Sequence, residues 1–123
     1  MKNTKLDLSR IELDLQILIF EEGDQHFVYS PSLDLTGYGD TTAKARKSFE
    51  ITLNEYLRYT QVKGTLVKDL KKHKWKITGQ GKKIKLEAPT LVELLRNNEH
   101  IQEIFNNHEF KKKDQRVVIP ELA

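Results

Sequence analysis

The chain has 123 residues, of which 37% are hydrophobic and 32% are charged, and its formal net charge is +3. This length and composition predict one domain with a single hydrophobic core and exclude a wholly disordered chain. Cysteine is absent, which excludes disulfides, thiolate metal sites and cysteine nucleophiles.

The N-terminal segment and the apolar runs bear on localisation. Residues 1–10 alternate charged and polar residues with single leucines and lack the apolar stretch of a signal peptide. The longest apolar run, Ile17 to Phe20, is far shorter than the roughly 20 residues that cross a bilayer. We therefore expect a cytoplasmic protein without a membrane partner, whose mature form starts at this N-terminus.

The first predicted element is a strand over residues 11–20, where apolar and polar side chains alternate. The alternation predicts burial of one face. Near the end of the strand Leu18 and Phe20 make the second face apolar as well, so another part of the chain or a second chain should cover them.

A turn containing Gly23 and a second strand, His26 to Ser30, follow. Pro31 ends this strand because proline has no amide donor for a strand ladder, and it favours an edge position. A short extended piece, Leu33 to Tyr38, leads to Gly39.

A long helix is expected next, with Asp40 or Thr41 accepting a hydrogen bond from an unpaired backbone N–H at its start. Its apolar residues fall on one stripe, which predicts that the helix lies across the sheet. The stripe consists of Ala45, Phe49, Leu53, Tyr56 and Leu57.

The rest of the chain predicts shorter elements. The first two are a short helix capped by Thr65 and a hairpin of residues 75–78 and 82–87 around Gly79 and Gly81. A helix that begins at the Thr90–Glu93 capping box follows, and Asn97 and Asn98 interrupt it before one more amphipathic turn or two. The last is an extended segment over 116–119.

These elements predict an α+β protein. Its small antiparallel sheet comprises about three N-terminal strands plus the later hairpin, with the long helix packed across it and short C-terminal helices. Residues 1–62 form the ββ(β)α core, and residues 63–123 form a C-terminal extension packed with the core as one domain.

Charge is concentrated in one segment. Residues 63–86 carry nine lysines against Asp69 alone, whereas residues 1–62 have a net charge of −3 and residues 87–123 a net charge of −2. An aromatic ring in a lysine field can stack on a base while the ammonium groups neutralise phosphates, so this segment is a candidate nucleic-acid contact. The alternative is a solvated hairpin around a packed tryptophan. The candidate residues are Lys71, Lys72, Lys74, Trp75, Lys76, Lys82, Lys83 and Lys85.

No pattern predicts an enzyme. A Gly-x-Ser-x-Gly elbow and a nucleotide-binding glycine loop are both absent, and turns explain the two Gly-x-Gly pairs. Glu12 and Asp14 share a strand face and could bind Mg²⁺ for hydrolysis, but the exposed half of an alternating strand explains them as well. We therefore expect no catalytic residue and no cofactor.

The histidines give one further candidate metal site. His100 and Glu103 are at helical spacing, with His108 and Glu109 close behind. Two helical neighbours do not supply the three or four ligands of a tight site, so we predict no metal here. His26 and His73 have no evident fellow ligand and are expected to be structural or exposed.

The segments FVYSPSL, from Phe27 to Leu33, and GYGDTTAKA, from Gly37 to Ala45, resemble the HicB-type antitoxin family. The resemblance covers about residues 11–60. It implies a small three-stranded sheet with a helix across it, similar to a reduced ribonuclease H fold that has lost catalysis. The motif residues are Pro31, Gly37, Gly39, Asp40, Thr41 and Ala45.

The resemblance also implies a partner. HicB-like proteins bind and mask a small basic ribonuclease toxin, and they often dimerise and bind their own operator. The negative charge of residues 1–62 suits a basic partner. We also expect a homodimer, because Pro31 marks an open edge and Leu18 and Phe20 add apolar surface. The alternative function is nucleic-acid binding through the lysine-rich hairpin around Trp75.

Overall fold

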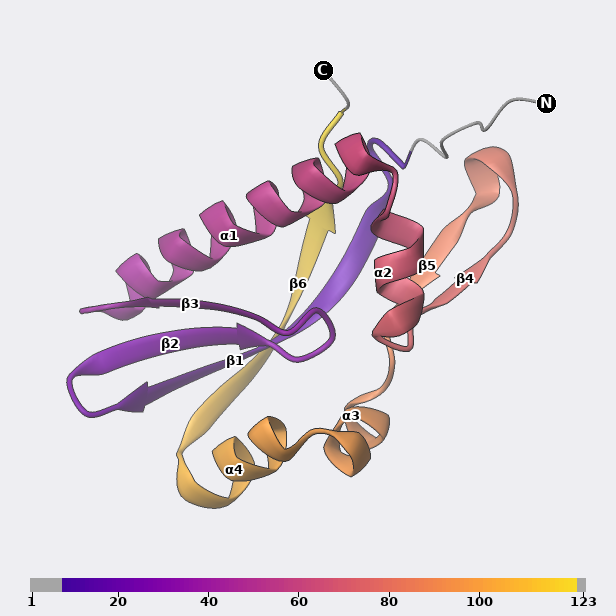
Figure 1. Ribbon diagram of the computed structural model, residues 1–123. Coiled ribbons are helices and arrows are strands. Elements are labelled where there is room, and N and C mark those ends of the chain that lie inside the picture. The colour runs from indigo at the N-terminus through magenta and orange to yellow at the C-terminus, as the bar shows by residue number, and fades with distance from the viewer. Residues whose placement is uncertain (1–7, 122–123) are drawn as a thin grey trace.

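The computed structural model describes residues 8–121, apart from the side chain of Lys82. The expectation about the mature N-terminus, drawn from residues 1–10, therefore lies mostly outside the described residues. The elements in chain order are β1 (Glu12–Glu22), β2 (Gln25–Ser30), β3 (Leu35–Gly39), α1 (Thr42–Lys63), α2 (Leu66–Lys72), β4 (Lys76–Thr78), a 3₁₀ turn (Gly81–Lys83), β5 (Lys85–Glu87), α3 (Leu91–Asn97), α4 (Glu99–Asn107) and β6 (Phe110–Val118) (Figure 1).

The main sheet has four strands in the order β3-β2-β1-β6, and every neighbouring pair is antiparallel. β4 and β5 form a separate two-stranded sheet. The predicted α+β class, with a long helix across an antiparallel sheet, a hairpin and short C-terminal helices, is confirmed.

The strand alternation divides the core between the two faces of the sheet. Ile17, Ile19 and Val28 point to the face that α1 covers, where Phe49 and Leu57 of the helix are buried against them. Successive side chains of a strand point to opposite faces, so the residues between them belong to the other side.

That other side is covered near the β1–β2 turn by α4. Leu18, Phe20 and Tyr29 form a second buried cluster there with Ile101 and Ile104 of α4. The apolar surface on which we based the homodimer is therefore already covered by this chain's own helix. Pro31 is buried as well, so this argument for a dimer was wrong, and the dimer stays a prediction without it.

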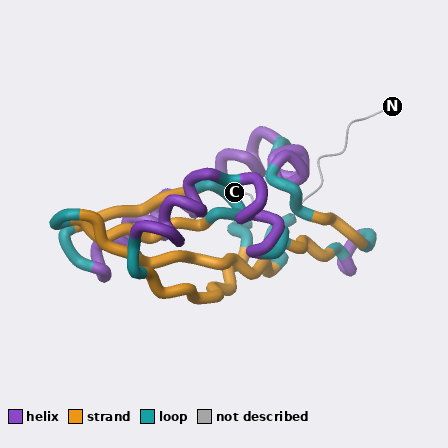
Figure 2. The backbone as a smooth tube through the Cα atoms, turned by 90° about the horizontal axis from the view of Figure 1, so that it is seen from below, coloured by secondary structure: helices purple, strands orange, loops and turns teal. Residues whose placement is uncertain are grey.

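The β4–β5 hairpin projects from one end of the molecule, at the right in both overview pictures (Figures 1 and 2). Its strands are shorter than predicted, because residues 81–83 form a 3₁₀ turn and the second strand starts only at Lys85. Gly79 has φ +80°, a left-handed conformation that strains other residues, and this explains the sharp turn after β4.

The helix ends mostly follow the sequence signals. Thr41 caps α1 by accepting a hydrogen bond from the Lys44 N–H at 3.1 Å, and Thr90 and Glu93 form the predicted capping box of α3. Asn98 breaks the helix and caps α4. Thr65 is the N-cap residue of α2, at the predicted position, but its hydroxyl makes no capping hydrogen bond.

The final strand is longer than the predicted segment 116–119. β6 begins at Phe110 and pairs with β1 from Phe20 to Glu12, so the C-terminal extension supplies the fourth strand of the main sheet. Its first six residues read FKKKDQ, which lacks apolar alternation because an edge strand exposes most of its side chains. None of the helices in the described part combines the length and apolar composition that a bilayer crossing requires.

Candidate protein-binding surfaces

The glycine motif brings α1 into direct contact with β3. A Cβ atom on Gly37 would lie 2.2 Å from the backbone nitrogen of Phe49, and one on Gly39 would lie 2.6 Å from Cβ of Lys44. Ala45 is fully buried at the same junction. Small residues at these positions therefore allow the helix backbone to sit on the strand, and the motif positions the fold rather than a ligand.

The remaining motif residues have similar local roles. Thr41 caps the helix as described, and Asp40 is exposed with its carboxylate 3.8 Å from the Lys44 ammonium group. Pro31 is buried beside the end of β2.

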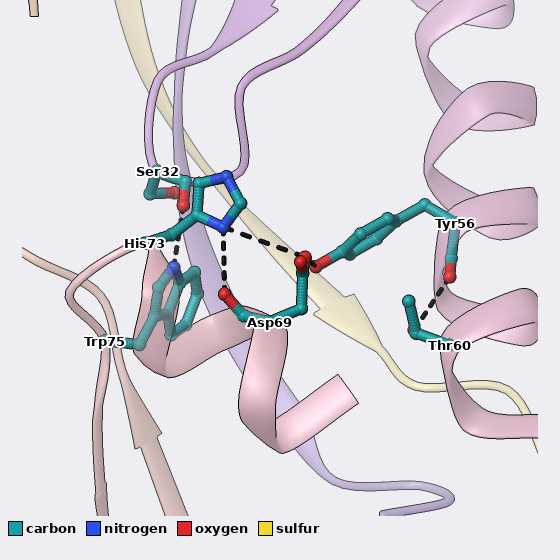
Figure 3. Close-up of polar contacts among 6 residues, drawn as sticks. All are labelled: Ser32, Tyr56, Thr60, Asp69, His73 and Trp75. Carbon is teal, nitrogen blue, oxygen red and sulfur yellow. Dashed lines mark hydrogen bonds and ion pairs between the residues drawn. The ribbon is translucent and has the colours of Figure 1, made fainter. Parts of the chain in front are cut away.

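Trp75, the proposed stacking residue, is buried in the main core with only 4% of its surface exposed. Its indole Nε1–H donates a hydrogen bond of 2.8 Å to the carbonyl oxygen of Ser32, in the loop after β2 (Figure 3). A ring held in this way cannot stack on a base. The prediction that Trp75 contacts nucleic acid is therefore wrong, and the packed alternative describes it.

The lysines around Trp75 are exposed. This holds for Lys71, Lys72, Lys74, Lys76, Lys83 and Lys85, whereas the side chain of Lys82 lies outside what the structure describes. Without an aromatic platform these lysines offer phosphate attraction alone, which favours binding that is independent of sequence. Nucleic-acid contact by the lysines stays a prediction.

Hydrogen bonds between polar side chains link α1 to α2 near Trp75 (Figure 3). The Tyr56 hydroxyl donates a hydrogen bond to the Asp69 carboxylate. His73 stands beside it, with Nδ1 2.9 Å from the carbonyl oxygen of Asp69 and 3.7 Å from its carboxylate. Burial and the hydrogen bond to Asp69 raise the pKa of the Tyr56 phenol well above its ordinary value of 10.0.

Another phenol, that of the fully buried Tyr29, lies under α4. The Tyr29 hydroxyl donates a hydrogen bond to Asp34 at 2.9 Å and accepts one from the Asn98 amide at 3.2 Å. Burial raises the pKa of Tyr29, opposed by the Asn98 hydrogen bond and assisted by Asp34.

The two phenols make stability depend on pH in the alkaline range. Tyrosines of the unfolded chain ionise near pH 10, whereas Tyr29 and Tyr56 keep their protons in the folded state, so unfolding releases protons and stability falls as pH rises above 10. We expect Tyr56→Phe to reduce the number of protons released on unfolding above pH 10 by about one per molecule, so that stability falls less steeply with pH. Urea titrations between pH 8.5 and 11 measure it. The control is Tyr59→Phe on the exposed face of α1, and an equal change in both variants would contradict the assignment.

The histidines and glutamates considered as a candidate metal site are not assembled into one. His108 Nε2 lies 3.3 Å from Glu103, but His100 packs against the Tyr29 ring instead. Among residues 8–121 no three His, Asp or Glu side chains are placed so that they could hold a metal ion. His26 contacts the Thr42 hydroxyl at 3.1 Å, a structural role in agreement with the sequence expectation.

Glu12 and Asp14 lie together on the face of β1 that α1 does not cover, at its end remote from α4. With Glu87 of β5 and Asp114 of β6 they line a cleft of about 500 Å³, and we call these four residues the acidic cleft. Among the described residues, Arg116 is the one cation that lines it, 3.3 Å from the Asp14 carboxylate. Gln16 also lines the cleft, and its amide oxygen has no hydrogen-bond partner among the described residues.

The acidic cleft could be predicted only in part. The alternation of β1 predicts that Glu12 and Asp14 share one face. The other two carboxylates of the cleft come from β5 and β6, which are distant in sequence but pack beside β1. Comparisons with protein-family models, curated proteins and solved structures give no match to this chain. The class that the fold defines is therefore an α+β protein with an open acidic cleft on its four-stranded sheet.

Proposed function

We propose that this chain is a non-catalytic binding protein that masks a small basic protein, in the manner of a HicB-type antitoxin acting on a ribonuclease toxin. The observation that carries the proposal is the acidic cleft. Arg116 pairs there with Asp14 and Lys112 with Asp114, which leaves Glu12 and Glu87 without an ion pair among the described residues. The resemblance of the Gly37 to Ala45 segment to the HicB-type family supports the same function.

The charges in the cleft favour a cationic side chain over a metal ion. Glu12 and Glu87 are exposed and have no ion pair within the described part of the chain, so a lysine or arginine of the partner can reach both. Complementary charge of this kind speeds association and selects the partner.

The test uses a tagged chain purified from its native host. We expect a small basic protein to purify in near-equal amount, and we expect Glu12→Gln with Glu87→Gln to weaken its binding about tenfold, since each exposed interfacial charge contributes modestly. Surface plasmon resonance with the isolated partner measures the affinity.

The matched control is Glu22→Gln with Glu55→Gln, which removes the same charge from exposed positions outside the cleft. Equal weakening by both double variants would mean that net charge, and not the cleft, drives binding. Recovery of nucleic acid in place of a protein would refute the proposal and favour the exposed lysines of α2 and the β4–β5 hairpin.

A further inference from the structure

β6 is the edge strand of the main sheet, and it is long. It pairs with β1 over all nine residues, and no other strand in the described part of the chain pairs with its outer side. The opposite edge strand, β3, has only five residues. Backbone groups on the outer side of β6, which we call the β6 edge, are therefore free to pair with another extended chain.

The β6 edge is strongly cationic. Lys111, Lys112, Lys113 and Arg116 are exposed along it, against Asp114 alone. Lys112 pairs with Asp114 at 3.6 Å and Arg116 pairs with Asp14 of β1. Lys111 and Lys113 form no ion pair with any residue that the structure describes, so part of this positive charge is not neutralised within the chain.

The two unpaired lysines lie on the face of the sheet that α1 covers. The register places them opposite Ile19 and Ile17 of β1, whose side chains point to this face. There they line a groove of about 650 Å³ together with Arg46 of α1. A strand added along β6 would place alternate side chains beside Lys111 and Lys113 on this face and beside Lys112 and Arg116 on the other.

We propose that the β6 edge binds an acidic, extended polypeptide segment of a partner protein as a fifth strand of the sheet. Carboxylates at alternate positions of that segment would pair with the lysines on each face, and its backbone would satisfy the outward N–H and C=O groups of β6.

Two other occupants fit less well. In the symmetric pairing of two β6 strands centred on Asp114, aspartate faces aspartate and Lys112 faces Arg116, and like charges directly opposite each other are destabilising. A nucleic acid offers no backbone donors for the carbonyl groups of the strand, so it cannot extend the sheet as a further strand.

The inference does not depend on the basic partner proposed above, because Lys111 and Lys113 lie outside the acidic cleft, although Asp114 and Arg116 border both surfaces. The test measures fluorescence anisotropy of a labelled peptide of about ten residues that alternates glutamate and valine, a length matched to β6 at roughly 3.3 Å per residue. We expect Lys111→Glu with Lys113→Glu to weaken binding about tenfold or more, since attraction is replaced by repulsion.

Three controls separate strand pairing from simple attraction of charge. Lys71→Glu with Lys72→Glu makes the same charge change on exposed positions of α2, and Glu12→Gln with Glu87→Gln alters only the acidic cleft. Both variants should bind the peptide within about twofold of the parent chain, because salt screens the exposed charges that lie away from the β6 edge. A peptide N-methylated at alternate amides should bind poorly, because it loses donors to the strand.

Hydrogen exchange of the parent chain gives an independent readout, with outward amides of β6 becoming protected when the peptide binds. Equal binding of the N-methylated peptide, equal loss with the α2 variant, or displacement of the peptide by an RNA of the same charge at equal concentration would each overturn the proposal. The last result would assign the β6 edge to nucleic acid.

Discussion

Replacing Trp75 by alanine should destabilise the protein by about 4 kcal/mol, because a buried aromatic side chain is lost from the main core and leaves a cavity. The Ser32 carbonyl oxygen also loses the indole donor, which adds the penalty of a buried unpaired acceptor. Urea denaturation followed by circular dichroism measures the free energy of unfolding.

The matched controls for this prediction are the neighbouring exposed residues. Lys74→Ala and Lys76→Ala should each change stability by less than about 0.5 kcal/mol, as surface substitutions usually do. Should Trp75→Ala cost as little as these lysine variants, the tryptophan would have to be exposed in solution. The nucleic-acid interpretation of the hairpin would then regain its stacking residue.

Gly37→Ala is the second substitution with a large expected effect. The new Cβ would lie 2.2 Å from the Phe49 nitrogen, 2.5 Å from the Phe49 Cα and 2.7 Å from the Ala45 carbonyl oxygen, all of them backbone atoms that cannot turn aside. The helix must therefore move off β3, and we expect a loss of about 3 kcal/mol or failure to fold.

Gly23→Ala is the control for Gly37→Ala. Gly23 has φ +63°, but a Cβ atom added there would meet nothing within 4 Å, so its replacement costs only the strain of a left-handed residue, about 1 kcal/mol. Thermal or urea unfolding of both variants distinguishes the effects. A loss at Gly37 no greater than that at Gly23 would show that α1 does not rest directly on β3.

The N-terminal half of the fold could be predicted because its signals are local. The alternation over residues 11–20, the extended piece before Gly39 and the apolar stripe of α1 each predict one element, and all three elements are present. The capping box at Thr90 is equally local, since the cap and its Glu93 partner are three residues apart.

Features that depend on distant contacts could not be predicted in this way. β6 is recognised by its pairing with β1, about a hundred residues earlier in the chain, and its lysine-rich first half has no strand pattern of its own. Trp75 lies among lysines in the sequence, yet its ring turns inward to a carbonyl of residue 32. The acidic cleft likewise needs three strands from different parts of the chain.

The motif residues determine how the fold packs and do not by themselves indicate a function. Gly37, Gly39 and Ala45 fit the HicB-type pattern and are placed where the pattern needs small residues, but they specify how helix and strand pack. Fold does not determine function, so the proposed masking of a toxin depends on the charge of the cleft and on finding the partner.

The most direct test of the proposed function is a ribonuclease assay on the co-purified partner, separated from this chain under denaturing conditions and refolded. We expect the partner alone to degrade RNA and this chain at equal molar amount to silence it, whereas about tenfold more of the Glu12→Gln/Glu87→Gln variant is needed. A partner without ribonuclease activity, or one whose activity this chain leaves unchanged, would contradict the account.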